Sequence, residues 1–251
     1  MKKTINVFLT ALVVFCAMSI SFAQTSTAKK VSGEKGGLSI GISAGSAIPL
    51  GKFTEYNAPI LGCAKIGSAS GLELSYALHK YFNLMLSGNY YTNPVDATKL
   101  AEGVWEENKT AKKIEILNVS PYMMGNVMLG IRPNFSLGAK MAVFVGISGG
   151  LLVVQTPSFT RHIEFPAAPV HQEIKGASAS AFCYQPQVGL QFKVGDAAAL
   201  SLFADYLGAK TSFDFTRSDK TSAPTESMEQ QIQLVNVGLK LSYTLSKKQN
   251  K

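Results

Sequence analysis

Apolar and polar residues alternate with a period of two along much of this chain. The clearest case is residues 233–243, QLVNVGLKLSY. Its apolar parity consists of Val235, Val237, Leu239, Leu241 and Tyr243, and its polar parity of Asn236, Gly238, Lys240 and Ser242. Successive side chains of an extended strand point to opposite faces. The pattern therefore predicts a β-strand with one apolar and one polar face.

Seven earlier segments show the same alternation. They are residues 37–48, 70–78, 81–91, 114–129, 140–154, 184–194 and 198–213. The segment 114–129 alternates clearly only at its beginning. A series of such segments is typical of an antiparallel barrel, so we expect an all-β fold: an eight-stranded antiparallel up-and-down transmembrane β-barrel. A count of ten strands stays open.

The connections between these segments are alternately short and long. Short ones lie at residues 79–80, 132–139 and 195–197; long ones lie at 49–69, 92–113, 155–183 and about 214–230. Short turns at one end and long loops at the other are typical of outer-membrane barrels. Alternation also continues past the roughly 10 residues that a tilted strand needs to cross lipid, so we expect strands that extend beyond the membrane.

The composition of the two parities indicates which face points outward. The polar parity is rich in small residues such as Ser39, Gly41, Ser43 and Gly45, which suit a narrow interior. Tyrosines and phenylalanines lie near segment ends, where interfacial aromatic girdles occur. These features favour apolar side chains facing lipid. The alternative is a soluble lipocalin-type barrel that binds a small apolar ligand inside.

The two ends of the chain differ from the middle. Residues 1–23 contain two lysines, an apolar run and a small-x-small ending, as a secretory signal peptide does, with cleavage expected between Ala23 and Gln24. We therefore divide the chain into the signal peptide 1–23, a polar periplasmic leader 24–36, the barrel 37–245 and a basic periplasmic tail 246–251.

The end of the last segment also carries a motif. Asn236, Gly238, Leu241 and Tyr243 form a polar-x-Gly-x-x-apolar-x-aromatic pattern, which resembles the assembly signal of bacterial outer-membrane barrels. Together with the signal peptide, the eight segments, Gly149-Gly150 and FADYLGAKTSF at 203–213, it makes the chain resemble the small porin-like outer-membrane β-barrel family of Gram-negative bacteria. The resemblance implies residence in the outer membrane with both termini periplasmic, contact with outer-membrane lipid and assembly by the barrel-assembly machinery.

Composition and charge narrow the function. The chain has 251 residues, 46% hydrophobic and 16% charged, with a net charge of +8. Its lysines gather in tails and loops without the basic, aromatic surface that nucleic acid needs, so no nucleic-acid partner is expected. Beyond the predicted signal peptide only Cys63 and Cys183 remain. We expect them unpaired, with a disulfide as the alternative.

No catalytic motif stands out. The chain has three histidines and lacks a nucleophile elbow, a metalloprotease motif and a phosphate loop. We therefore expect a non-enzymatic protein without a cofactor, in a structural, surface-interaction, adhesion or envelope-assembly role. An outer-membrane hydrolase is the less favoured alternative. The partner is expected at the long loops, where Trp105 is either a binding anchor or a packing residue.

Charged residues on the polar parity should meet inside the barrel. Glu73 and Asp205 are expected to pair with Lys193 and Lys240, because an unpaired charge in a narrow lumen is costly. Eight strands leave just enough width for side chains to fill the interior. The sequence therefore predicts a plugged lumen and not a diffusion channel.

One connection carries a repeated His-x-Glu pattern, formed by His162 with Glu164 and by His171 with Glu173. If Phe165 pairs with Val170 across a four-residue turn, all four side chains share one face of a hairpin. Imidazole and carboxylate groups suit zinc, so a divalent-metal site is one hypothesis. The other is a solvated face of cross-strand His/Glu pairs.

Overall fold

The computed structural model describes residues 37–57, 61–79, 81–166, 168–195, 197–215 and 226–245. The predicted signal peptide 1–23 with its Ala23–Gln24 cleavage site, the leader 24–36 and the tail 246–251 lie outside these ranges. Within the described ranges, no helix is long and apolar enough to span a membrane.

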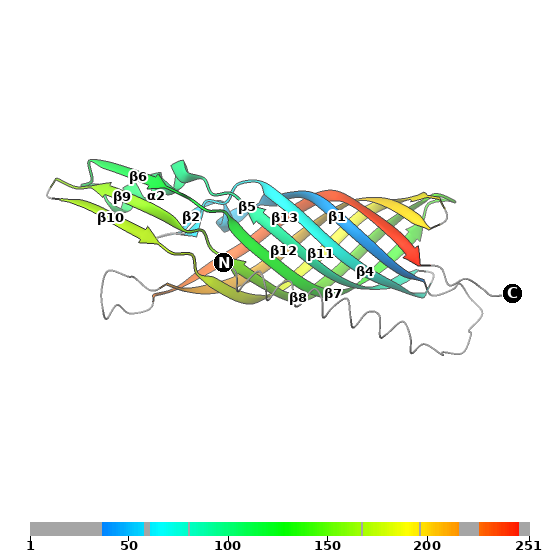
Figure 1. Ribbon diagram of the computed structural model, residues 1–251. Coiled ribbons are helices and arrows are strands. Elements are labelled where there is room, and N and C mark those ends of the chain that lie inside the picture. Colours follow the sequence, from blue (N-terminus) through cyan, green and yellow to red (C-terminus); the bar gives the residue numbers. More distant parts are fainter. Residues whose placement is uncertain are drawn as a thin grey trace. The chain divides into compact units, whose positions relative to one another are not determined.

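Eight antiparallel strands close into a barrel, with β1 hydrogen-bonded to β13 along the seam (Figure 1). The strands are β1 (Leu38–Pro49), β4 (Gly67–His79), β5 (Phe82–Asn93), β7 (Tyr122–Ser136), β8 (Met141–Gln155), β11 (Ser178–Val194), β12 (Ala198–Phe215) and β13 (Glu226–Leu245). Apart from the seam, each strand pairs with the barrel strands that precede and follow it in the chain. The predicted eight-stranded up-and-down barrel is confirmed.

The barrel carries its apolar side chains on the outside. Leu239 in the middle of β13 is 54% exposed, whereas Lys240 and Asn236, on the opposite face of the same strand, are 5% and 1% exposed. The outward set also includes Ile40, Ile42, Leu72, Leu84, Val127, Leu129, Ile131, Val145, Ile147, Leu151, Val188, Leu202, Val237 and Leu241. A closed sheet with an apolar exterior satisfies its backbone groups internally and presents hydrocarbon to hydrocarbon. This is the transmembrane type of barrel; a lipocalin-type barrel would have the opposite orientation.

Close packing at the seam explains a glycine of the C-terminal motif. A Cβ atom added to Gly238 would collide with the backbone of Ala44 and Gly45, and one added to Gly45 would collide with Val237 and Gly238. The Phe203 ring lies against the same spot from the lumen. Gly45 and Gly238 therefore allow β1 and β13 to approach each other.

The prediction that residues 114–129 form one strand was wrong. Residues Lys113–Leu117 form β6 in a separate sheet, and β7 begins only at Tyr122. Between them Asn118 has a φ of 54°, a left-handed conformation that interrupts an extended strand. At the other end β7 continues to Ser136, so Arg132 lies within the strand and not in the expected turn 132–139.

The long connections fold into additional elements at one end of the barrel. These are η1 (Gly51–Phe53), β2 (Tyr56–Asn57), β3 (Leu61–Gly62), α2 (Ala97–Glu107), β6, β9 (Phe159–Glu164) and β10 (Pro169–Ile174). Strands β10, β9 and β6 form a three-stranded sheet in that order, and α2 packs on it where Val104 meets Ile114 and Ile163. We call α2, β6, β9 and β10 the platform. Trp105 lies on α2 and is 41% exposed.

Local chemistry supports the helix of the platform. The Asp96 carboxylate accepts a hydrogen bond from the backbone N–H of Lys99 at 3.2 Å, which caps the first turn of α2. The same aspartate lies 3.9 Å from Lys65 Nζ, at the start of β4. The cap and this contact attach the beginning of α2 to the rim of the barrel.

A matched pair of leucines tests the orientation of the barrel. Leu239→Arg, at the middle of the apolar exterior, should lower the free energy of unfolding by about 2 to 4 kcal/mol, because arginine near the bilayer centre loses its hydration. Leu117→Arg on β6 is the control, since Leu117 is 50% exposed outside the barrel, and it should have little effect. Urea unfolding in lipid vesicles measures both. Equal, small effects would contradict a lipid-facing exterior.

Candidate functional site

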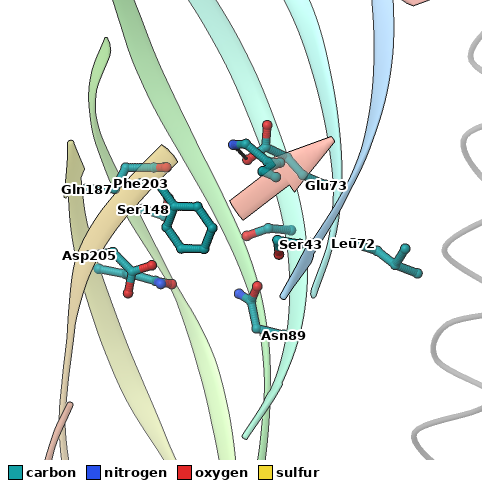
Figure 2. Close-up of a pocket in the computed structure, with 11 residues that line it drawn as sticks. Ser43, Leu72, Glu73, Asn89, Ser148, Gln187, Phe203 and Asp205 are labelled. Atoms are coloured by element: carbon teal, nitrogen blue, oxygen red, sulfur yellow. Dashed lines mark hydrogen bonds and ion pairs between the residues drawn. The ribbon is translucent and has the colours of Figure 1, made fainter. Parts of the chain in front are cut away.

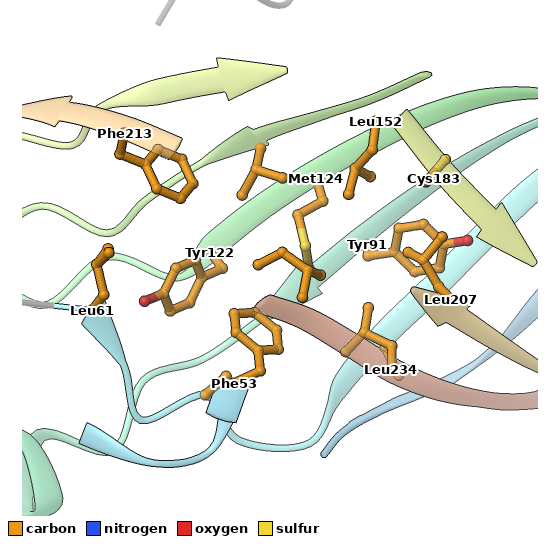
Figure 3. Close-up of a cluster of buried hydrophobic side chains, with 14 of the residues drawn as sticks. Phe53, Leu61, Tyr91, Tyr122, Met124, Leu152, Cys183, Leu207, Phe213 and Leu234 are labelled. Carbon is orange, nitrogen blue, oxygen red and sulfur yellow. The ribbon is translucent and has the colours of Figure 1, made fainter. Parts of the chain in front are cut away.

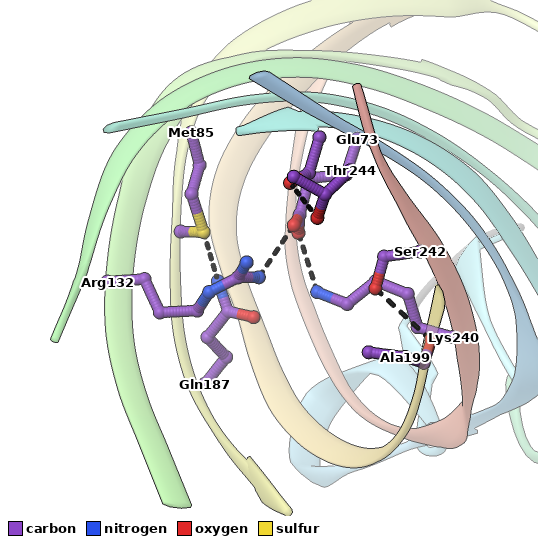
Figure 4. Close-up of polar contacts among 9 residues, drawn as sticks. Glu73, Met85, Arg132, Gln187, Ala199, Lys240, Ser242 and Thr244 are labelled. Carbon is purple, nitrogen blue, oxygen red and sulfur yellow. Dashed lines mark hydrogen bonds and ion pairs between the residues drawn. The ribbon is translucent and has the colours of Figure 1, made fainter. Parts of the chain in front are cut away.

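The middle of the lumen contains a buried cluster of charges. Arg132 on β7 and Lys240 on β13 both donate to the carboxylate of Glu73 on β4, with Arg132 Nη1 2.6 Å from Oε1 and Lys240 Nζ 2.7 Å from Oε2 (Figure 4). The side chains of Glu73, Arg132 and Lys240 are 12%, 6% and 6% exposed. Charge-assisted hydrogen bonds of this length are among the strong ones. They join three strands across the interior.

An aromatic ring also contacts the two cations. The guanidinium carbon of Arg132 lies 5.1 Å and Lys240 Nζ 5.2 Å from the centre of the Phe144 ring on β8. The face of an aromatic ring attracts cations, so Phe144 partly offsets the repulsion between two positive charges that share one carboxylate. We call Glu73, Arg132, Lys240 and Phe144 the charged layer.

The structure brings together some of the charges predicted for the lumen and separates others. Glu73 meets Lys240, whereas Asp205 accepts a hydrogen bond from the Asn236 amide at 2.6 Å. Lys193 is exposed near the short turn that follows β11, where water solvates its ammonium group, and it forms no ion pair within the described ranges. The expected pairing of Lys193 is therefore corrected: Arg132 is the second cation, and sequence reasoning missed it because it placed Arg132 in a turn.

A polar layer lies beside the charged one. The Asn89 amide donates to Asn126 Oδ1 at 2.9 Å, and the Asn126 amide donates to the Tyr91 hydroxyl at 3.3 Å. Asn89 also lines a cavity of about 40 Å³, shown in Figure 2. Its lining includes Ser43, Glu73, Ser87, Asn89, Ser148, Gln185, Gln187, Phe203, Asp205 and Lys240. The volume suits one or two waters and is too small for a metabolite.

An apolar layer lies in the lumen at the end that carries the long connections. Inward-facing barrel residues pack there against side chains from outside the barrel (Figure 3). The barrel contributes Tyr91, Met124, Leu152, Cys183, Leu207 and Leu234, and the connection before β4 contributes Phe53, Leu61, Cys63 and Ala64. Every one of these side chains is at most 6% exposed. The mouth is therefore filled by a hydrophobic core.

Tyr122 fixes the connection that covers the mouth. Its hydroxyl accepts a hydrogen bond from the Gly62 N–H at 2.8 Å and donates to the Gly62 carbonyl at 3.2 Å. Its ring packs edge-on against Phe53, with the ring centres 4.9 Å apart. Sequence reasoning missed this layer, although a signal exists: near the long connections both parities become apolar, as in Leu151–Leu152–Val153–Val154.

Both cysteines belong to the apolar layer and are free thiols with no exposed surface. Burial raises the pKa of the Cys63 thiol to about 11, and the nearby carboxylates of Asp96 and Glu102 add to the effect although Lys99 opposes it. A thiol with such a pKa is almost fully protonated at neutral pH, and the thiol form is a poor nucleophile.

The His-x-Glu hairpin has a different register from the expected one. Glu164 pairs with Pro169 and His162 with His171, so the four-residue turn comprises residues 165–168. The pairing of Phe165 with Val170 was wrong, because Phe165 leaves the strand and packs beside Val104 and Ile163. The rings of His162 and His171 face each other with centres 3.8 Å apart.

This register does not assemble the metal site. Glu164 and Glu173 are displaced along the strands from the two imidazoles, opposite Pro169 and Thr160. Among the residues that the structure describes, no group of three or more His, Cys, Asp or Glu side chains is placed to hold a metal ion. The arrangement favours the other hypothesis, a solvated polar face.

Glu115 extends that polar face onto β6. Its Oε2 lies 4.0 Å from His162 Nδ1, and its Oε1 lies 2.6 Å from Lys113 Nζ. The hydrogen bond and charge of Lys113 lower the pKa of the Glu115 carboxyl. The outer face of the platform therefore carries a row formed by Glu115, His162 and His171 across its three strands.

Comparison with known proteins shows which solved structures share this fold. No family model matches the chain, and no curated protein matches its sequence. Among solved structures, the outer-membrane protein AlkL in lipid bilayers superposes with a TM-score of 0.51 at 13% identity, over 91% of this chain and 99% of AlkL. Neisserial surface protein A gives 0.48 at 7% identity, over 84% of this chain and all of its own. The attachment invasion locus protein Ail of Yersinia pestis, bound to the heparin analogue sucrose octasulfate, gives 0.44 at 13% identity, over 84% and 100%.

The likeness to AlkL shows that this chain has the fold of the small outer-membrane β-barrel proteins. The resemblance predicted from the sequence is thus confirmed at the level of fold.

Removal of the central carboxylate tests the charged layer. Glu73→Ala leaves two cations without a counter-charge in the lumen and should lower the free energy of unfolding by about 3 to 5 kcal/mol. The matched control is Glu229→Ala, which removes an equally short 2.7 Å contact with Lys210 between exposed side chains and should cost less than about 1 kcal/mol. Urea titration of the folded barrel measures both, and similar losses would mean that the lumen is well hydrated.

Thiol reactivity tests the apolar layer. At pH 8 neither Cys63 nor Cys183 should react with iodoacetamide in the folded protein, because both are buried and the pKa of Cys63 is about 11. Both should react after unfolding in guanidinium chloride. Mass spectrometry counts the modified thiols. Rapid labelling of the folded chain would show that the mouth is open to solvent.

Proposed function

We propose that this protein is a non-enzymatic integral outer-membrane barrel with a closed lumen, which displays the platform outside the cell as a binding surface. The proposal rests on one observation above all: two buried layers of side chains lie within the lumen, while the long connections form an ordered sheet and helix at one end. The ordered elements outside the barrel therefore form a surface, and the side chains inside the barrel do not form a pathway through it.

The charged and apolar layers support a closed lumen. Charge-assisted hydrogen bonds join Glu73 to Arg132 and Lys240 across the interior, and the core around Phe53 and Tyr122 fills one mouth. An ion crossing the barrel would have to break the first set of contacts and displace the second. A fixed plug of this kind supports a structural or adhesive role over a porin role.

The same interior supports a non-enzymatic role. Its ionisable groups satisfy one another, and the cavity beside them has a volume of about 40 Å³, which leaves no room for a substrate. Binding by the platform is the alternative use of the molecule. Its outer face offers two adjacent imidazoles and several carboxylates, and α2 adds the partly exposed indole of Trp105, a residue type common in binding anchors.

Orientation in the membrane is part of the proposal. Outer-membrane barrels place short turns in the periplasm and long loops outside, so the turns between β7 and β8 and between β11 and β12 would be periplasmic, together with both termini. The motif residues Asn236, Gly238, Leu241 and Tyr243 would then reach the barrel-assembly machinery from the periplasm. Leu241 and Tyr243 face outward, where a partner could contact them.

Electrical recording tests the closed lumen. Protein reconstituted in a planar bilayer should show no steady conductance above the bare membrane, because both layers obstruct the barrel. Altered mobility of unboiled samples in detergent electrophoresis verifies that the inserted protein is folded. Long-lived conductance steps from folded protein would contradict the proposal.

Surface labelling tests the orientation with two exposed leucines. Leu117 on the platform is 50% exposed and Leu137 in the turn after β7 is 57% exposed. A membrane-impermeant maleimide should label Leu117→Cys on intact cells and Leu137→Cys only after the outer membrane is permeabilised. The native cysteines are buried and add little background. The reverse result would place the platform in the periplasm.

A further inference from the structure

Strand β10 is an open edge of the platform sheet. Within the described ranges it pairs with β9 alone, whereas α2 packs against the face of the sheet beside the opposite edge strand β6. Four of its six residues, Pro169, Val170, His171 and Glu173, are exposed. Alternate backbone N–H and C=O groups of such an edge are unpaired and form a template for another strand.

The sequence of β10 is complementary to itself. If two copies pair antiparallel about Gln172, His171 of each copy faces Glu173 of the other, and Val170 faces Ile174. An imidazole N–H then meets a carboxylate on the outer face, and two apolar pairs meet on the inner face, where Ile174 already packs against the core of the protein. Within the described part of the chain, the Glu173 carboxylate has no hydrogen bond or ion pair. Such cross-strand pairs stabilise a sheet.

The connectivity sets the direction of β10. Gln155 at the end of β8 pairs with Ser178 at the start of β11, and the Thr156 N–H donates to the Ala177 carbonyl at 2.9 Å. The β9–β10 hairpin therefore continues the β8–β11 pair away from the barrel, with the ends of β9 and β10 that meet at the hairpin turn pointing away from it (Figure 1). Antiparallel pairing of two such hairpins places the two barrels at opposite ends of the joined sheet.

We propose that two copies of this chain in opposed membranes join edge to edge through β10 and form a continuous six-stranded sheet. This inference rests on the proposed function, because it requires the platform outside the cell. At about 3.3 Å per residue, the path from Ser178 to Gln172 spans about 20 Å, so the two barrel rims would lie about 40 Å apart. The partner of the platform is then the same protein on a neighbouring cell or vesicle.

A single contact of this size is weak. Six residues on each side make an interface below the area of a stable dimer. Many copies fixed in two facing membranes act together, and such multivalency raises the overall affinity without new contacts. Pairing is therefore expected between membranes and not between molecules diluted in detergent.

Cysteine crosslinking between vesicles tests the register. In the proposed pair Gln172 faces Gln172 of the other copy at a Cα separation of about 4.5 to 5.5 Å, which a disulfide can span. Vesicles carrying the full chain with Gln172→Cys should yield crosslinked dimers on mild oxidation. Val170→Cys alone should not, since the two thiols lie about four residues apart along the strands. Vesicles with His171→Cys mixed with vesicles with Glu173→Cys should yield dimers again.

A charge reversal tests the contact itself. Wild-type vesicles should tether one another and raise the turbidity several-fold, and Glu173→Lys should abolish this rise because it places a lysine opposite His171. Glu164→Lys on β9 is the matched control: it reverses the same charge on the same face away from the edge and should tether like the wild type. Heat-modifiable mobility verifies that each variant is folded.

The outcomes separate the two proposals. Failure of Gln172→Cys to crosslink, loss of tethering in both lysine variants or dimers confined to single vesicles would overturn the pairing through β10. Crosslinking of Gln172→Cys on cells to another protein alone would also overturn it. Absence of maleimide labelling of Leu117→Cys on intact cells would instead overturn the proposed function itself.

Discussion

Closure of the sheet is the constraint on which the rest of the structure depends. In lipid every backbone N–H and C=O must find a partner within the protein, and the seam between β1 and β13 supplies the last set of partners. The seam is possible because Gly45 and Gly238 let the two strands approach without side chains between them. Once the barrel is closed, each side chain of a barrel strand points either toward lipid or toward the lumen.

Closure with eight strands also determines the chemistry of the interior. The lumen is so narrow that side chains from opposite strands touch. A charged side chain placed there must be neutralised by a side chain of another strand. Glu73 therefore holds Arg132 and Lys240 from two other strands, and Asp205 is satisfied by Asn236. These contacts brace the barrel from inside by joining strands that lie on different sides of the lumen.

The platform is continuous with the barrel in its strands and in its apolar packing. Strand β9 continues from β8, and the apolar layer passes from barrel residues such as Leu152 and Leu234 to Phe53 and Phe159 outside it. The platform is therefore anchored by the same core that closes the mouth. Its edge strand β10 is thus attached to the barrel through this core.

The sequence by itself predicted the number of barrel strands and the orientation of most of their side chains, because a period of two is a local property. Leu239 and Asn236 could be assigned to lipid and lumen for this reason. Only the tertiary structure decided which groups meet: Arg132 and not Lys193 joins Glu73, and His162 faces His171 and not Glu173. Such pairings depend on the register between strands and on where each turn begins, and a shift of one or two residues changes every partner while the alternation stays the same.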